Sequence, residues 1–195
     1  MANLRVEKIT STETFETTGS VQFNLGASDA TRDRLTIASN SDFTTSGDFT
    51  IEAWIYPFNQ VTGGTANSIF GIGDYDSSTG FLFYLKSDGL LSFYTGSDEN
   101  NTTFKVDSST WHHVALVRSG ETITIYADGK FIESYNYDNT FSGLAIIGGN
   151  STNGSDSIGG FNGHISNVRY VNGRALYTEN FKPPMRELEN IPGTV

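Results

Sequence analysis

Along much of the chain every second residue is apolar, which is the period of two that a half-buried β-strand requires. The segment 49–56 reads FTIEAWIY, so successive side chains of an extended backbone point to opposite faces. One face carries Phe49, Ile51, Ala53 and Ile55, and the other carries Thr50, Glu52, Trp54 and Tyr56. The pattern predicts a strand whose apolar face lies in a core.

Two further strands and the turn into a third are predicted by WHHVALVRSGETITIYADGKFIE. The apolar run Val114–Val117 ends at Ser119-Gly120, after which Ile123 and Ile125 alternate with threonines. Asp128-Gly129 then supplies a tight hairpin turn. This order is typical of an antiparallel meander, although the facing of the continuous run stays open.

Short stretches of this kind recur along the chain, separated by turns rich in Gly, Asn, Asp and Ser. They are residues 21–25, 34–39, 48–57, 67–73, 80–87, 90–96, 103–106, 112–118, 122–128, 130–137, 144–149 and 163–171. Residues 185–190 come nearest to a helix and are too short to form a stable one. We predict an all-β fold, a two-sheet antiparallel jelly-roll sandwich. Its expected core includes Phe49, Ile51, Ala53, Ile55, Val114, Leu116, Ile123, Ile125, Ile165 and Val168.

Composition supports one globular domain and narrows the class of protein. Of the 195 residues, 36% are hydrophobic and 13% aromatic, which is enough for a packed core. The net charge is -10 and the twelve Lys and Arg are scattered, so we expect no nucleic-acid partner. Without cysteine there are no disulfides, thiol catalysis or zinc-thiolate sites. Nowhere do eighteen apolar residues run together, so no membrane insertion is expected.

Polar and proline-rich ends flank the strand-forming region. Residues 1–19 are rich in Thr, Ser and Glu and are interpreted as an N-terminal arm or attachment segment. Residues 20–184 form the predicted domain, and residues 185–195 are interpreted as a C-terminal extension or linker. The N-terminal stretch has no apolar core of signal-peptide length, which predicts synthesis in a cytoplasm without secretion.

Acidic and basic residues form no recognisable catalytic motif. Retaining glycoside hydrolysis needs two carboxylates about 5 Å apart on one face. Glu52 has no carboxylate at the next same-face positions. His112 and His113 are adjacent on a predicted strand, so they point to opposite faces and cannot chelate one ion together. We therefore expect no enzymatic activity.

Three blocks follow one another in an informative order. They are GDFTIEAWIYP (47–57), WHHVALVRSGETITIYADGKFI (111–132) and GFNGHISNVRYVNGRALY (160–177). Together they resemble the concanavalin A-like lectin/glucanase superfamily, with laminin-G and pentraxin-like domains as the nearest branch, over residues 20–184. The last block, continuing as YTENFKPP, is similar to the ends of such domains in bacteriophage tail and virion proteins. The resemblance implies a jelly roll, often with a rim calcium ion and often binding sugar.

The same resemblance implies a non-enzymatic virion structural protein of a bacteriophage, made in the host cytoplasm. The chain would sit on a capsid or tail with other virion subunits, in many copies, and its lectin-like domain would contact host-surface glycans. Two alternatives stay open: an architectural or decoration domain that binds neighbouring subunits without sugar, and a bacterial surface adhesin. The three share one scaffold because a ligand site would lie in variable loops.

The loop GDYDSSTG, residues 73–80, is the first candidate metal site. Asp74 and Asp76 stand two residues apart among hydroxyl and carbonyl oxygens, which are the ligands that calcium prefers. The loop is not an EF-hand, since Thr79 and Leu85 occupy the positions of its required glycine and final acidic residue. The resemblance implies an acidic ligand directly before the next strand, where Thr79 and Gly80 stand.

A second metal proposal is formed by Asn24 and Asp33, which stand where many lectin-like domains carry acidic residues beside their first strands. The alternative interpretation of Asp74 and Asp76 is that both simply solvate a turn.

Tyrosines near predicted turns are the candidate sugar platform. The candidates are Tyr75, Tyr94, Tyr135 and Tyr137, with Asp138 and Asn139 as polar neighbours. Aromatic rings stack on the apolar face of a pyranose, while amides and carboxylates hydrogen-bond its hydroxyls. The alternative for each tyrosine is ordinary packing, which is also the interpretation of Trp54 and Trp111.

Overall fold

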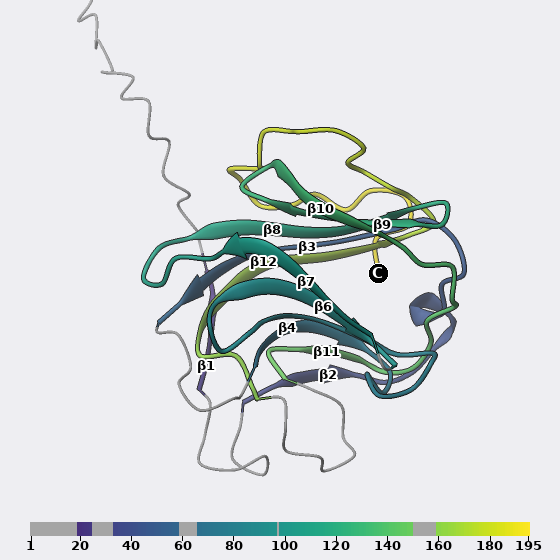
Figure 1. Cartoon of the computed structure of the whole chain (residues 1–195), viewed down its shortest axis with the longest axis horizontal. Coiled ribbons are helices and arrows are strands. Elements are labelled where there is room, and N and C mark those ends of the chain that lie inside the picture. The colour runs from purple at the N-terminus through teal and green to yellow at the C-terminus, as the bar shows by residue number, and fades with distance from the viewer. Residues whose placement is uncertain (1–18, 25–32, 59–65, 97, 150–158) are drawn as a thin grey trace, which may run out of the picture.

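The computed structural model describes residues 19–24, 33–58, 66–96, 98–149 and 159–195. These residues form two six-stranded antiparallel sheets packed face to face (Figure 1). Sheet A has the order β1 (Val21–Phe23), β12 (Gly163–Asn172), β3 (Phe49–Pro57), β8 (His112–Ser119), β9 (Thr122–Ala127) and β10 (Lys130–Asn136). Sheet B has the order β2 (Leu35–Ile37), β11 (Ala145–Ile147), β4 (Asn67–Ile72), β5 (Phe81–Leu85), β6 (Leu90–Thr95) and β7 (Asp98–Lys105). The predicted all-β two-sheet sandwich is confirmed.

The described residues contain no α-helix, only a 3-10 turn at Ser41–Phe43. Residues 185–190 are not helical. The strand predicted at residues 103–106 is longer, because β7 already begins at Asp98 and pairs with β6 through its polar half. The polar half escaped the sequence prediction since an edge strand with exposed side chains carries no apolar alternation.

The turn between β9 and β10 is the tight hairpin expected at Asp128-Gly129. Both residues have positive φ, 49° and 72°. The Asp128 carboxylate accepts the backbone N–H of His113 at 3.0 Å and contacts Nδ1 of His112 at 2.8 Å. The turn is thereby tied to the start of β8.

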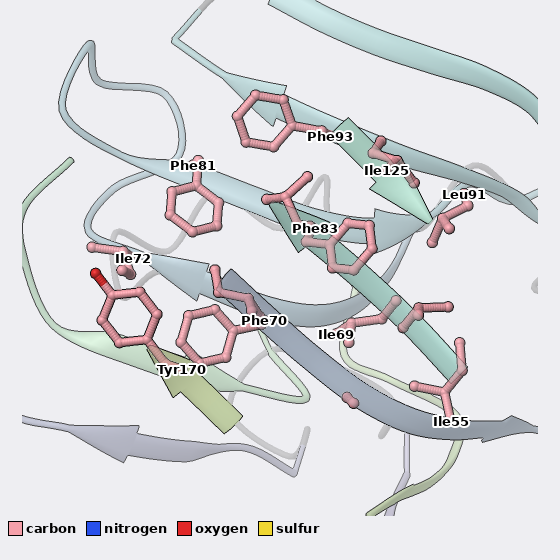
Figure 2. Packing of buried hydrophobic residues seen from close by; sticks show 14 of the residues in the cluster. Ile55, Ile69, Phe70, Ile72, Phe81, Phe83, Leu91, Phe93, Ile125 and Tyr170 are labelled. Carbon is pink, nitrogen blue, oxygen red and sulfur yellow. The ribbon is translucent and has the colours of Figure 1, made fainter. Parts of the chain in front are cut away.

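The core lies between the sheets, and Figure 2 shows side chains of both sheets meeting there, among them Ile55 and Ile125 of sheet A and Phe83 of sheet B. Nine of the ten residues predicted for the core are at most 2% exposed. The exception is Val168, which is half-buried and packs against the core from a bulge in β12. The bulge interrupts the alternation from which its position was predicted.

The continuous run Val114–Val117 is buried on both faces of sheet A. Val114 and Leu116 lie in the main core, whereas Ala115 and Val117 point to the outer side. There they pack against residues of the C-terminal segment, including Tyr177. Burial on both faces explains why this strand lacks polar alternation.

The C-terminal segment, residues 173–195, runs across the outer side of sheet A (yellow in Figure 1). The Phe181 N–H donates to the Gly129 carbonyl at 2.9 Å, and the indole N–H of Trp54 donates to the Pro184 carbonyl at 3.0 Å. Its last residue donates from the Val195 N–H to the Tyr170 carbonyl at 3.0 Å. Residues 185–195, the predicted extension or linker, therefore lie along β12. Their role in attachment stays a prediction. Most of the predicted arm, residues 1–18, lies outside the described residues.

No helix in the described part of the chain is long and apolar enough to cross a membrane.

Close packing of the C-terminal segment predicts that Gly129→Ala destabilises the domain more than Gly120→Ala. Both glycines have positive φ, which costs an alanine about 1 kcal/mol. An added Cβ at Gly129 would lie 2.0 Å from the Phe181 carbonyl oxygen, whereas nothing lies within 4 Å at Gly120. Urea unfolding of the two variants measures the difference. Equal losses would contradict the packing of the segment on the turn.

Candidate functional site

Three segments that are distant in sequence converge at one end of the sandwich. The backbone N–H of Gly96, after β6, donates to the Tyr75 carbonyl at 2.8 Å. The N–H of Ser142 donates to the Thr79 carbonyl, also at 2.8 Å. We call this end the loop rim; it comprises residues 73–80, 95–96 and 137–144. The loop rim therefore brings together the metal candidates Asp74 and Asp76 and most of the predicted sugar-binding residues.

Tyr75 and Tyr94 pack edge to face at the loop rim, with ring centroids 5.6 Å apart. Tyr75 is buried, so its ring supports the structure, whereas Tyr94 is only half-buried and lies on the outer face of sheet B. Partial burial raises the pKa of Tyr94, and the nearby charges of Asp76 and Glu99 raise it further. Of this pair, Tyr94 is the ring that a ligand can reach.

Tyr137 is turned inward rather than presented to solvent. Its ring stacks on Phe141 with centroids 5.3 Å apart, and its hydroxyl is hydrogen-bonded to the Thr95 hydroxyl. The same hydroxyl accepts from Nδ2 of Asn139 at 3.0 Å. This tyrosine and Asn139 hold the end of β6 against the segment that follows β10.

The remaining two sugar candidates, Tyr135 and Asp138, lie in different surroundings. Tyr135 packs against the core from β10, and burial raises its pKa, with a further contribution from Glu133. Asp138 is exposed at the loop rim. Tyr75 and Tyr94 therefore pack on the outer face of sheet B, whereas Tyr135 and Tyr137 pack against the main core.

A polar network beside Tyr94 was missed by the sequence analysis. Oε1 of Glu99 on β7 accepts the Tyr84 hydroxyl at 2.6 Å and lies 3.3 Å from Nζ of Lys86. Nδ2 of Asn101 donates to the other carboxylate oxygen at 3.2 Å, and the Ser92 hydroxyl donates to Oδ1 of Asn101 at 3.0 Å. These contacts hold the Glu99 carboxylate and the Asn101 amide on the surface of the sheet.

The register of sheet B explains this grouping. Tyr94 is the partner of Glu99, and Ser92 is the partner of Asn101, so the four side chains share the outer face. The Tyr84 hydrogen bond is the main cause that lowers the pKa of Glu99, and amide and lysine contacts lower it further against the opposing effect of burial. We call this surface the polar face of sheet B; it comprises Tyr75, Tyr84, Lys86, Ser92, Tyr94, Glu99 and Asn101.

The calcium candidates at the loop rim form a two-carboxylate turn. Oδ1 of Asp74 accepts the Asp76 backbone N–H at 3.3 Å. Burial raises the pKa of Asp76, and the charge of Asp74 raises it further. Calcium takes six to eight oxygen ligands, and the described residues contain no group of three His, Asp or Glu that could hold a metal. The two carboxylates fit calcium in ligand type, and the remaining ligands would be carbonyls or water; the ion stays a prediction.

Asn24 and Asp33 lie away from the loop rim. Oδ2 of Asp33 accepts both the backbone N–H and Nδ2 of Asn24, at 3.0 and 2.9 Å. Asn24 follows β1, which pairs with the Gly163 end of β12, whereas the loop rim adjoins the opposite end of the sandwich. The two metal proposals therefore concern separate places and cannot share one ion.

Glu52 is fully buried on the outer side of sheet A, under the C-terminal segment. Its carboxylate contacts Nε2 of His113 at 3.0 Å and accepts the Tyr177 hydroxyl at 2.7 Å and Nε of Arg169 at 2.8 Å. Burial alone would raise the pKa of Glu52, but the His113 hydrogen bond and charge, with Tyr177 and Arg169, outweigh it and lower the pKa. These contacts favour the ionised form of the Glu52 carboxylate.

Comparison with known proteins gives one family and several solved structures. A laminin-G model described as the concanavalin A-like lectin/glucanases superfamily matches residues 10–180. No curated protein sequence matches the chain. A putative carbohydrate binding protein from Bacteroides ovatus has a TM-score of 0.65 and 19% identity, over 90% of this chain and 49% of that one.

Two further solved structures share the fold. The SAP-like pentraxin of Limulus polyphemus has a TM-score of 0.59 and 18% identity, over 77% of this chain and 74% of that one. The CBM40 domain of Ruminococcus gnavus IT-sialidase, bound to α2,3-sialyllactose, has a TM-score of 0.52 and 15% identity, over 68% of this chain and 86% of that one. These likenesses show a common fold, and the chain spans about half the length of the Bacteroides structure.

The buried ion cluster predicts a pH-dependent loss of stability in Glu52→Gln. Removing the charge leaves Arg169 and His113 without their partner, which costs about 3 kcal/mol at pH 7. The folded pKa of Glu52 is lowered, so its contribution is complete above its unfolded value of 4.5 and is lost as the pH falls below it. The stability gap between wild type and variant, measured by urea unfolding, should therefore narrow below pH 4.5.

Glu99→Gln is the matched control for this prediction. Glu99 also has a lowered pKa, but its side chain is 42% exposed and solvent screens its ion pair. Its substitution should cost less than about 1 kcal/mol at pH 7. A Glu52→Gln gap that stays constant from pH 7 to pH 3 would show that folding does not lower the pKa of Glu52.

Proposed function

The chain belongs to the concanavalin A-like lectin/glucanases superfamily, and from this membership we propose that it is a non-catalytic carbohydrate-binding domain. The observation that carries the proposal is the polar face of sheet B, where a half-buried Tyr94 stands beside Glu99 and Asn101. An aromatic ring offers stacking to the apolar side of a sugar, and carboxylate and amide groups bind its hydroxyls.

Carbohydrate-binding structures among the solved neighbours support the proposal. One is named a putative carbohydrate binding protein, and another is bound to sialyllactose. The fold is shared, but a ligand is not inherited with a fold. Sugar binding by this chain therefore depends on its own polar face.

The charge on the polar face favours an uncharged or amino sugar over an anionic one. Asp76, Asp98 and Glu99 all lie close enough to Tyr94 to raise the pKa of its phenol. Lys86 is already paired with Glu99. A carboxylated sugar such as sialic acid would meet these negative charges, and like charges brought together reduce affinity.

Non-catalytic binding is supported by the surroundings of Glu52. Retaining hydrolysis needs a second carboxylate about 5 Å away and access for the sugar. The Glu52 carboxylate is instead occupied by His113, Arg169 and Tyr177 beneath the C-terminal segment.

Tyr94→Ala is expected to weaken binding to a neutral polysaccharide by about tenfold, since loss of a stacked ring costs on the order of 1 kcal/mol or more. Affinity electrophoresis with mannan, glucan and galactan gels measures the retention. Tyr137→Phe is the control, because its ring remains stacked on Phe141 and it should bind like wild type. If Tyr94→Ala and wild type are retained equally, the polar face of sheet B is not the sugar site.

We also propose calcium at Asp74 and Asp76 as a support for this surface, because the turn they form carries Tyr75 against Tyr94. The same gels, run in millimolar calcium and in excess chelator, provide the comparison. Bound calcium should raise both the retention and the unfolding midpoint. Asp76→Asn should abolish the difference, and identical behaviour in the two buffers would exclude the ion.

The finer proposal is that the domain is displayed in many copies on a bacteriophage capsid or tail. It follows from the resemblance of residues 160–177 and their continuation to virion proteins. Sugar sites on open surfaces bind weakly, and linking several of them raises avidity about a hundredfold or more without new contacts. Mass spectrometry of purified particles should detect the chain, and a multimer should bind host envelope polysaccharide more strongly than the monomer. A chain absent from particles would favour the adhesin, and one present without sugar binding would favour the architectural domain.

A further inference from the structure

Four aromatic rings gather on the outer side of sheet A, at the end far from the loop rim. Tyr56 and Phe58 come from β3 and the residue after it, Trp111 precedes β8, and His164 lies on β12. The Tyr56 ring centroid lies 5.5 Å from that of Trp111, and the Phe58 centroid lies 5.0 Å from that of His164. We call these four residues the aromatic patch.

Strand pairing places these rings on the surface rather than in the core. Tyr56 follows the core residue Ile55 and therefore points outward, and its partner across the strands is His164. All four rings are half-buried. Trp54, one step along the same face, is instead 5% exposed and is covered by the C-terminal segment at Pro184.

The rings pack at steep angles, which leaves ring faces turned in different directions. Phe58 meets His164 at 87°, and Tyr56 meets Phe58 at 78°. Edge-to-face packing of this kind fills only part of each ring surface. A half-buried tryptophan beside a half-buried tyrosine is a large, rigid apolar platform.

Uncharged polar groups surround the platform. The Ser20 hydroxyl lies 3.4 Å from Nδ1 of His164, and Gln22 is paired with His164 across β1 and β12. The Ser109 hydroxyl and the Asn162 carbonyl are both hydrogen-bonded to the backbone of Phe58. Hydroxyl, amide and imidazole groups around an aromatic platform match a neutral sugar, which has an apolar face and hydroxyls that both donate and accept.

We propose that the aromatic patch is a second carbohydrate-binding site, which takes an uncharged pyranose of a neutral polysaccharide. Trp111 stacks on the sugar ring, Tyr56 contacts its edge with a ring tilted by 59° to that of Trp111, and Gln22 and His164 hydrogen-bond its hydroxyls. The patch lies on the opposite sheet from the polar face of sheet B. One domain then holds two glycan segments, which increases retention on a polymer in the way that any pair of linked sites does.

The chain carries its own reporter for this site, because its two tryptophans are Trp54 and Trp111. Trp54→Phe leaves Trp111 as the single emitter. Titration of this variant with hexasaccharides of glucose, mannose, galactose and N-acetylglucosamine should give a saturable change in emission with at least one of them. The complementary variant Trp111→Phe, in which the covered Trp54 emits, should give none.

Further variants in the Trp54→Phe background separate this proposal from the proposed function. Tyr56→Ala should weaken the titration about tenfold with an unchanged unfolding midpoint, whereas Tyr94→Ala should leave it unchanged. Loss of the signal in Tyr94→Ala would show that Trp111 reports the polar face from a distance and would overturn the second site. If the Trp111 signal persists in Tyr94→Ala and the gels retain this variant fully, the proposal that the polar face of sheet B binds sugar is overturned instead.

Wild-type chain titrated in parallel guards against a folding defect in Trp54→Phe. No emission change in wild type with any of the four sugars would overturn the proposal. The proposal would also be overturned by a Tyr56→Ala variant that binds every sugar like its parent but no longer enters particles. That result would identify the aromatic patch as a protein-docking surface.

Discussion

Burial of one carboxylate constrains the whole outer side of sheet A. Glu52 lies in the middle of β3 and stays ionised there only because partners compensate the cost of removing a charge from water. Arg169 and Tyr177, which provide two of these partners, are 117 and 125 residues away in sequence. The ion cluster thus requires β12 and the C-terminal segment to be in place at the same time. Stability of this face is cooperative because no single segment completes the cluster.

The covered centre of sheet A decides where a ligand can bind. The C-terminal segment packs on Ala115, Val117 and Tyr126, so the face that β8 and β9 would otherwise present is interior. The polar face of sheet B and the aromatic patch both keep partly exposed aromatic rings beside fixed polar groups. They differ in charge, because carboxylates lie near Tyr94 whereas Ser20 and Gln22, beside His164 of the aromatic patch, are uncharged. The two proposed sites therefore suit neutral polymers better than acidic ones.

The three solved structures compared above are under 20% identical to the chain. What they share is the sandwich, which depends on the apolar inner faces of two sheets. The outer faces and loops carry the differences, since their side chains do not support the core. The glutamate and asparagine of β7 that hold the polar face, Glu99 and Asn101, belong to this variable part of the molecule.

Local pattern decided the fold class, the positions of most strands and the hairpin at Asp128-Gly129. Alternation with period two and turn residues that accept positive φ are properties of neighbouring residues, so they can be read without knowing the partners. Strand register and contacts between distant segments are not visible in the local pattern. The register of β7 against β6 placed Glu99 and Asn101 beside Tyr94. Contacts between segments far apart in sequence bonded Tyr137 to Thr95 and covered Trp54 with the C-terminal segment, while Trp111 stayed half-buried. The strand register and the covering of sheet A by the C-terminal segment depend on the packing energy of the whole core. Residues of one type therefore lie on the surface in one place and support the structure in another.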